Sequence, residues 1–200
     1  MHDALLLRLE PRADADDAVL MAFAVACAGS LRSAPERVGV HRAIASSLAY
    51  VYFEFARAVM IGDDERAVFE RDARSLSSFA DTKIGVDRLT RLLSPPAACA
   101  GASPSHCYVV ETAAAPGWDA ELASWYDTEH MPGLAAVPGC VRAQRFVNVD
   151  AGPWSHACYD LVSLETTASK AWLAVRGTAW SDRVRPQFRD TRRTMFRSLR

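Results

Sequence analysis

The two halves of this sequence are related to each other, and this duplication limits what the chain can fold into. Residues 5–7 and 108–110 are apolar runs of strand type at equivalent positions. At the same spacing three residues are identical, namely Pro35, Val38 and Arg42 in the first half and Pro138, Val141 and Arg145 in the second. These matches, each 103 positions apart, indicate a structural unit that occurs twice. We expect two copies, residues 1–94 and 106–200, joined by a Pro- and Ala-rich linker at 95–105.

Each half has the pattern strand, helix, strand, strand, helix, strand. The expected elements are 4–9, 17–32, 38–46, 48–59, 64–80 and 84–93, and then 107–112, 119–134, 141–149, 156–164, 167–181 and 194–199. Asp16 and Asp119 stand where each first helix would be capped. The order βαββαβ is the ferredoxin-like unit, whose sheet carries both helices on one face. Because the other face needs a cover, the predicted fold class is α+β, with two ferredoxin-like repeats forming an intrachain dimeric α+β barrel.

Charge and composition exclude several classes of protein. The chain has 23 basic and 24 acidic residues among 200, a balance that does not attract nucleic acid. Its longest apolar run, residues 18–28, is shorter than the roughly 20 residues of a membrane span. The five scattered cysteines are typical of a reducing compartment. We therefore expect a soluble cytoplasmic protein that binds neither nucleic acid nor membrane, and the spacing of ligand-type residues predicts no metal site.

Residues 125–139 read WYDTEHMPGLAAVPG. This segment resembles the first-helix signature of the EthD-like branch of the dimeric α+β barrel superfamily, in which Trp/Phe-Tyr-x-x-x-His-x-Pro precedes a Pro-Gly turn. The resemblance implies a tandem, fused version of that barrel. Members of the superfamily include isomerases, dehydratases, cofactor-independent monooxygenases, haem enzymes and proteins without an assigned activity.

The same segment brings together residues that can carry acid–base chemistry. On a helix, Tyr126 and Asp127 lie four and three residues before His130, on its side of the helix. A carboxylate beside an imidazole orients it and favours its charged form. If the helix ends at Pro132, the helix dipole also favours the charged form of His130. His130 is thus a candidate general acid and base, with Asp127 orienting it, Tyr126 donating to a substrate oxygen and Trp125 forming an apolar wall. The alternative is a helix-end histidine in a surface ion pair, with Trp125 in the core.

The first half lacks this constellation. The residues equivalent to Tyr126, Asp127 and His130 are Phe23, Ala24 and Cys27. We therefore expect one working site, in the C-terminal half, with the N-terminal half as a scaffold. The alternative is that the first helix is merely more deeply buried.

Other charged residues give weaker signals. Arg145 could bind a substrate carboxylate, but its repeat mate Arg42 favours a structural ion pair. His156 is a further candidate substrate-binding residue, although the strand alternation places it on the opposite face from Tyr159. The last 25 residues carry eight arginines against Asp182 and Asp190. An anionic substrate could exploit this excess, and a solvated helix face explains it as well.

These features predict a small-molecule enzyme without an organic cofactor. Its substrate would be a hydrophobic cyclic or aromatic oxygenated compound, and proton transfer by His130 would drive isomerisation, dehydration or another lyase step, or oxygenation. One alternative is a haem protein with His130 as the axial ligand. Another is a non-catalytic ligand-binding or interaction module, which an exposed His130 would favour. The chain would be a monomer with an intrachain barrel or a homodimer.

Overall fold

A computed structural model describes residues 1–12, 14–77 and 83–200. The chain divides into two compact units. The first contains Met1–Thr90 together with Phe196–Arg200, and the second contains Arg91–Met195. No helix in these described ranges combines the length and the apolar character that crossing a membrane requires.

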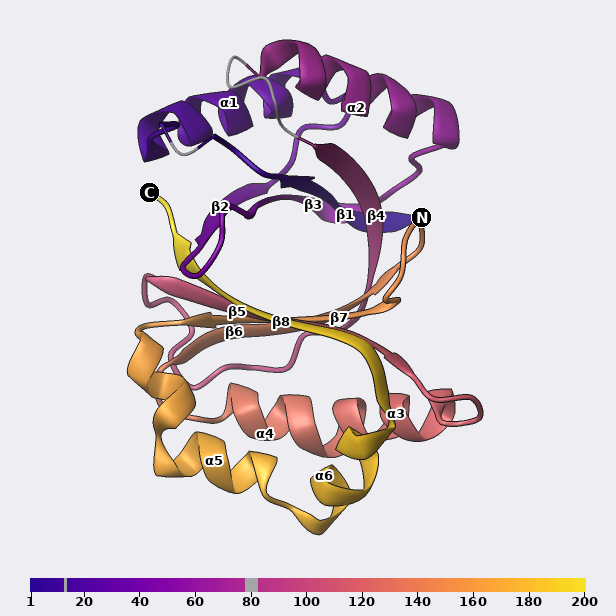
Figure 1. The fold of residues 1–200 in the computed structure, drawn as a ribbon, viewed down its shortest axis with the longest axis vertical. Coiled ribbons are helices and arrows are strands. Elements are labelled where there is room, and N and C mark those ends of the chain that lie inside the picture. Colours follow the sequence, from indigo (N-terminus) through magenta and orange to yellow (C-terminus); the bar gives the residue numbers. More distant parts are fainter. Residues whose placement is uncertain (13, 78–82) are drawn as a thin grey trace. The chain divides into compact units, whose positions relative to one another are not determined.

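The first unit is a four-stranded antiparallel sheet with two helices on one face (Figure 1). Its elements are β1 (His2–Leu9), α1 (Asp17–Ser30), β2 (Arg37–Ala43), β3 (Ala49–Val59), α2 (Asp63–Leu76) and β4 (Ile84–Leu93). The strand order is β4–β1–β3–β2, and β1 runs antiparallel to both of its neighbours. The expected end of the second helix, residues 78–80, lies outside the described residues.

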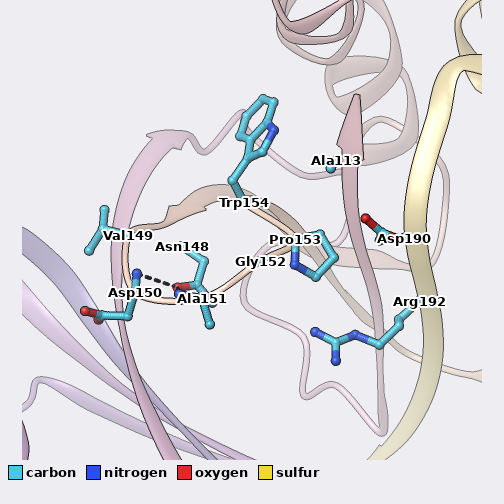
Figure 2. A pocket seen from close by; sticks show the side chains of 10 residues that line it. All are labelled: Ala113, Asn148, Val149, Asp150, Ala151, Gly152, Pro153, Trp154, Asp190 and Arg192. Carbon is cyan, nitrogen blue, oxygen red and sulfur yellow. Dashed lines mark hydrogen bonds between the residues drawn. The ribbon is translucent and has the colours of Figure 1, made fainter. Parts of the chain in front are cut away.

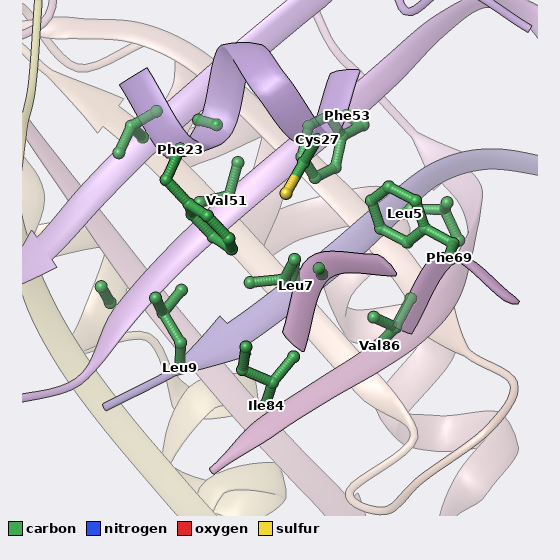
Figure 3. Packing of buried hydrophobic residues seen from close by; sticks show 14 of the residues in the cluster. Leu5, Leu7, Leu9, Phe23, Cys27, Val51, Phe53, Phe69, Ile84 and Val86 are labelled. Atoms are coloured by element: carbon green, nitrogen blue, oxygen red, sulfur yellow. The ribbon is translucent and has the colours of Figure 1, made fainter. Parts of the chain in front are cut away.

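The first helix and the core beneath it follow from local sequence. The Asp16 side chain accepts a hydrogen bond from the Val19 amide at 2.8 Å, so the predicted cap of α1 is confirmed. Alternate residues of β1 reach the helix-side core, where Leu5 and Leu7 pack near Phe23 and Cys27 of α1 (Figure 3). The positions equivalent to Tyr126 and His130 are therefore filled by core side chains in this unit.

The second unit repeats the arrangement, with its helices on one face of the sheet β8–β5–β7–β6 (Figure 1). Its elements are β5 (His106–Ala114), α3 (Asp119–Trp125), the π turn η1 (Tyr126–His130), α4 (Met131–Ala135), β6 (Cys140–Asn148), β7 (Ser155–Leu161), the 3₁₀ turn η2 (Leu164–Ala168), α5 (Lys170–Arg176), α6 (Ala179–Val184), the 3₁₀ turn η3 (Arg185–Gln187) and β8 (Phe188–Ser198). The predicted fold class, α+β with two βαββαβ halves, is confirmed.

Several details of the second unit differ from the sequence prediction, among them the start of β8, which lies at Phe188 and not at residue 194. Asp119 is the first residue of α3 and not its cap, because that position belongs to Trp118, which makes no side-chain capping bond. The expected helix 167–181 is two helices, since Gly177 ends α5 and the Thr178 side chain caps α6 by accepting from the Ser181 amide at 3.1 Å.

Candidate functional site

The motif segment contains a π turn where the sequence predicted a regular α-helix. The Met131 amide donates to the Tyr126 carbonyl, five residues back, and the helix then continues through Pro132 as α4. A proline inside a helix lacks an amide donor, and its ring clashes with the carbonyl four residues earlier, here that of Thr128. The wider turn relieves this clash, and such turns are frequent at functional sites. The expected helix end at Pro132 is therefore wrong.

The π turn decides which side chains lie against His130. Its ring stacks on Trp125, five residues earlier, with ring centroids 4.0 Å apart and an interplanar angle of 19°. Tyr126 meets it edge-on at 5.6 Å, as the predicted spacing required. The His130 side chain is buried, with 8 % exposure, and its Nδ1 has no hydrogen-bond partner among the described residues.

His130 lines a small cavity between the sheet and the helices of the second unit. Its aromatic lining comprises Tyr108, Trp125, Tyr126, Tyr159, Trp172 and Phe188. Arg176, Arg185 and Arg193 supply three positive charges. The enclosed volume is about 20 Å³, room for a single water molecule. Because Arg193 is exposed and Arg176 half-buried, a larger ligand would enter by moving the side chains at the mouth.

The charge state of His130 is the opposite of the predicted one. Burial and the positive charges of Arg185 and Arg176 lower its pKa from 6.5 to about 3. The imidazole is therefore neutral at physiological pH and can accept a proton. Burial raises the pKa of Tyr126, so its phenol stays protonated.

Asp127 does not take the role that the α-helical spacing suggested. Its carboxylate accepts a hydrogen bond from Arg145 Nη1 at 2.6 Å, and Arg145 is fully buried. The same guanidinium lies 5.1 Å from the centre of the Tyr126 ring. Arg145 thus forms the structural ion pair that Arg42 had suggested, and it is not among the side chains that line the cavity. The Arg145 guanidinium, fixed by Asp127, thus packs over the ring of Tyr126.

Hydrogen bonds to the α6 cap fix the plane of the aromatic stack. Trp125 Nε1 donates to Ser181 Oγ at 3.3 Å. The Thr178 hydroxyl donates to Glu129 at 2.6 Å, and the Ser181 hydroxyl donates to the Val175 carbonyl at 3.2 Å. Trp125 therefore belongs both to the core and to the cavity wall, and His130 rests on a ring that cannot rotate freely.

His156 lies on the other face of the sheet from the cavity. Its Nδ1 is 3.6 Å from Glu111 Oε1, and that carboxylate also accepts from Arg192 at 3.2 Å. Burial lowers the pKa of His156, but Cys158 and the Glu111 carboxylate raise it more, to about 10. The alternation with Tyr159 is as predicted, and the structure does not bring His156 to His130.

A second hollow, of about 650 Å³, lies at the loop between β6 and β7 (Figure 2). Asn148 folds this loop, since its side-chain oxygen accepts from the amides of Asp150 and Ala151. Arg192 and the exposed Asp190 of β8 lie opposite the loop. None of the predicted site residues lines this hollow, so the cavity at His130 is the candidate active site.

The cavity does not fit a haem. Pockets for large ligands have volumes on the order of several hundred Å³, and a macrocycle much larger than a two- or three-ring aromatic compound would have to displace both Trp125 and Trp172, which are fully buried. We therefore do not assign His130 as an axial ligand.

The sequence prediction missed the arginines of the cavity. Arg176, Arg185 and Arg193 belong to α5, η3 and β8. Their signal was the arginine excess of the last 25 residues, which a solvated face explained equally well. Tyr159 and Trp172 were missed too. Aromatic residues in apolar strands and helices usually serve core packing, so nothing in the sequence marked these two as lining a cavity.

No family model matches the chain, and no curated protein sequence matches it. Several solved structures do match along its whole length. A candidate monooxygenase from Lactobacillus acidophilus NCFM has a TM-score of 0.66 and 11 % identity, over 99 % of this chain and 94 % of that one. One from Fusobacterium nucleatum has a TM-score of 0.65 and 6 % identity, over 100 % and 93 %. An anthrone oxidase-like protein has a TM-score of 0.61 and 14 % identity, over 100 % and 92 %. These likenesses show that the chain shares the fold of these proteins.

Proposed function

We propose that the cavity of the C-terminal half binds an oxygenated aromatic compound and that His130 removes a proton from it. One observation carries this proposal: a buried, neutral imidazole with an unpartnered Nδ1 lies among six aromatic rings. A neutral imidazole accepts a proton, and the rings exclude water and hold a flat substrate. Tyr126, kept protonated, would donate a hydrogen bond to a substrate oxygen. Asp127 would position Tyr126 indirectly, by fixing the Arg145 guanidinium that lies over its ring.

Oxygenation is the reaction we propose to follow. Loss of a proton from a CH₂ group that is conjugated with a carbonyl through an aromatic ring gives a carbanion that reacts with O₂. The peroxide takes back the proton held by His130, and loss of water leaves a carbonyl, so CH₂ and O₂ become C=O and H₂O. The likeness to candidate monooxygenases and to an anthrone oxidase-like protein supports this choice. We also propose that the chain belongs to the EthD-like branch, on its Trp-Tyr-x-x-x-His-x-Pro segment.

The test is oxygen uptake with anthrone as the probe substrate. Binding is first measured by quenching of Trp125 and Trp172, which line the cavity. His130→Ala should lower the rate about 10²- to 10⁴-fold, whereas the control His106→Gln, outside the cavity, should not. Unchanged uptake by His130→Ala would contradict the proposal. Turnover of a bound compound without oxygen uptake would indicate isomerisation or elimination, which begin with the same proton transfer. Buried His130 does not favour a purely ligand-binding module.

A further inference from the structure

Three guanidinium groups converge on the cavity from separate elements. Arg176 ends α5, Arg185 begins η3 and Arg193 lies on β8, and all three line the cavity beside His130. They are close enough to affect one another, because burial together with Arg176 and Arg193 lowers the pKa of Arg185. Like charges gathered at a partly buried site repel each other, so the arrangement costs stability unless an anion offsets it.

Three carboxylates of the helix that carries His130 are engaged elsewhere. Asp127 pairs with Arg145, Glu121 with Arg183, and Glu129 accepts from Thr178. Asp182 is the one acid whose charge raises the pKa of Arg185, and this effect is smaller than that of the other causes. Within the described ranges, no ion-pair partner lies within 4.0 Å of the guanidiniums of Arg176, Arg185 and Arg193.

The cavity also holds buried donors without acceptors. Tyr159 Oη and Trp172 Nε1 have no hydrogen-bond partner among the described residues, and both side chains are almost completely buried. Buried donors of this kind normally find an acceptor. Cations and unpaired donors that line the same cavity are complementary to a ligand with a charged oxygen group.

We propose that the substrate of this cavity is an aromatic acid, whose carboxylate is bound by Arg176, Arg185 and Arg193. A planar guanidinium binds a planar carboxylate through two parallel hydrogen bonds. The aromatic part of the ligand rests on the proposed function, whereas the anionic part rests on the arginines alone.

Binding of such an anion also has a consequence for the base. An imidazole with a pKa of about 3 is a weak base at neutral pH. A carboxylate on the arginines cancels part of the positive field that acts on His130, so its pKa rises toward the range useful for catalysis. The substrate would thus activate the group that deprotonates it.

The test compares naphthoate with naphthamide, which have the same rings and shape and differ in charge. By calorimetry, naphthoate should bind about tenfold more tightly or better. Arg185→Gln should remove most of that difference, and Arg193→Gln, at an exposed position, should lower it in the same direction. The control Arg183→Gln, whose native partner is Glu121 outside the cavity, should keep it.

A second readout follows the His130 imidazole by NMR, with His130→Gln for assignment. Its pKa should rise when naphthoate is bound and stay unchanged with naphthamide. Equal affinities for the two ligands, absence of binding by both, or an equal effect of Arg183→Gln would overturn the inference. Selective binding of naphthoate by a protein that turns over no aromatic compound would contradict the proposed function and leave this inference standing.

Discussion

Acid sensitivity offers a direct check on the environment of His130. In the unfolded chain an imidazole titrates near 6.5, and in the fold burial and the charges of Arg185 and Arg176 lower the pKa to about 3. Between these values the unfolded state binds a proton that the folded state does not. The stability due to neutral His130 is therefore complete above pH 6.5 and is lost as the pH falls toward 3. Each pH unit costs about 1.4 kcal/mol, so about 2 kcal/mol is lost by pH 5.

The perturbation is His130→Gln, which removes the titration and keeps a neutral polar side chain. Urea unfolding, followed by tryptophan fluorescence, gives the free energy of unfolding at about pH 7.5 and pH 5. Wild type should lose about 2 kcal/mol more than the variant over this range. The other charged or titratable groups around the ring are present in both proteins, namely Arg176, Arg185, Arg193, Tyr108, Tyr126 and Tyr159. An equal or larger loss in the variant would mean that His130 is charged in the fold, and would refute the reasoning.

Two further predictions concern residues away from the cavity. His156 has a pKa raised to about 10, so its contribution is complete below pH 6.5 and lost as the pH rises toward 10. Wild type should then lose more stability than His156→Gln between about pH 7 and pH 9 in urea unfolding, and parallel losses would contradict the buried charge at Glu111. Gly139→Ala should lower the free energy of unfolding by about 1–3 kcal/mol, because φ is +98° and a Cβ would lie 2.5 Å from Thr166 Oγ1. Gly117→Ala is the matched control, with φ +82° and open space around it, and a loss equal to that of Gly139→Ala would show that the contact with Thr166 contributes nothing.

The sequence pattern predicted what depends on neighbouring residues. The Asp16 cap is a bond to an amide three residues away, and the βαββαβ order follows from local periodicity. Tyr126 lies against His130 as its spacing required. Asp127 was placed wrongly because the π turn, in which the Met131 amide bonds to the carbonyl five residues back, changes the angular spacing along the helix, so that Trp125 lies beside the imidazole.

The electrostatics of the cavity could not be read in the same way. Arg176, Arg185 and Arg193 stand on three elements, and their convergence depends on the break at Gly177 and Thr178 that ends one helix and begins another. A motif-based prediction gave His130 a carboxylate partner, while the fold surrounds it with guanidiniums. The sequence therefore predicted a raised pKa for His130, whereas the tertiary contacts lower it.

Strand β8 has a consequence for the modularity of the chain. Its residues up to Met195 belong to the second unit, whereas Phe196–Arg200 belong to the first. There Phe196, Arg197 and Ser198 pair with Ala43, Arg42 and His41 at the edge of β2, and the Leu199 amide donates to the Val40 carbonyl at 2.8 Å. A chain cut at the linker would leave this edge with unpaired backbone groups, which invite aggregation. The sheet of the first unit therefore includes the last residues of the chain, and its β2 edge depends on them.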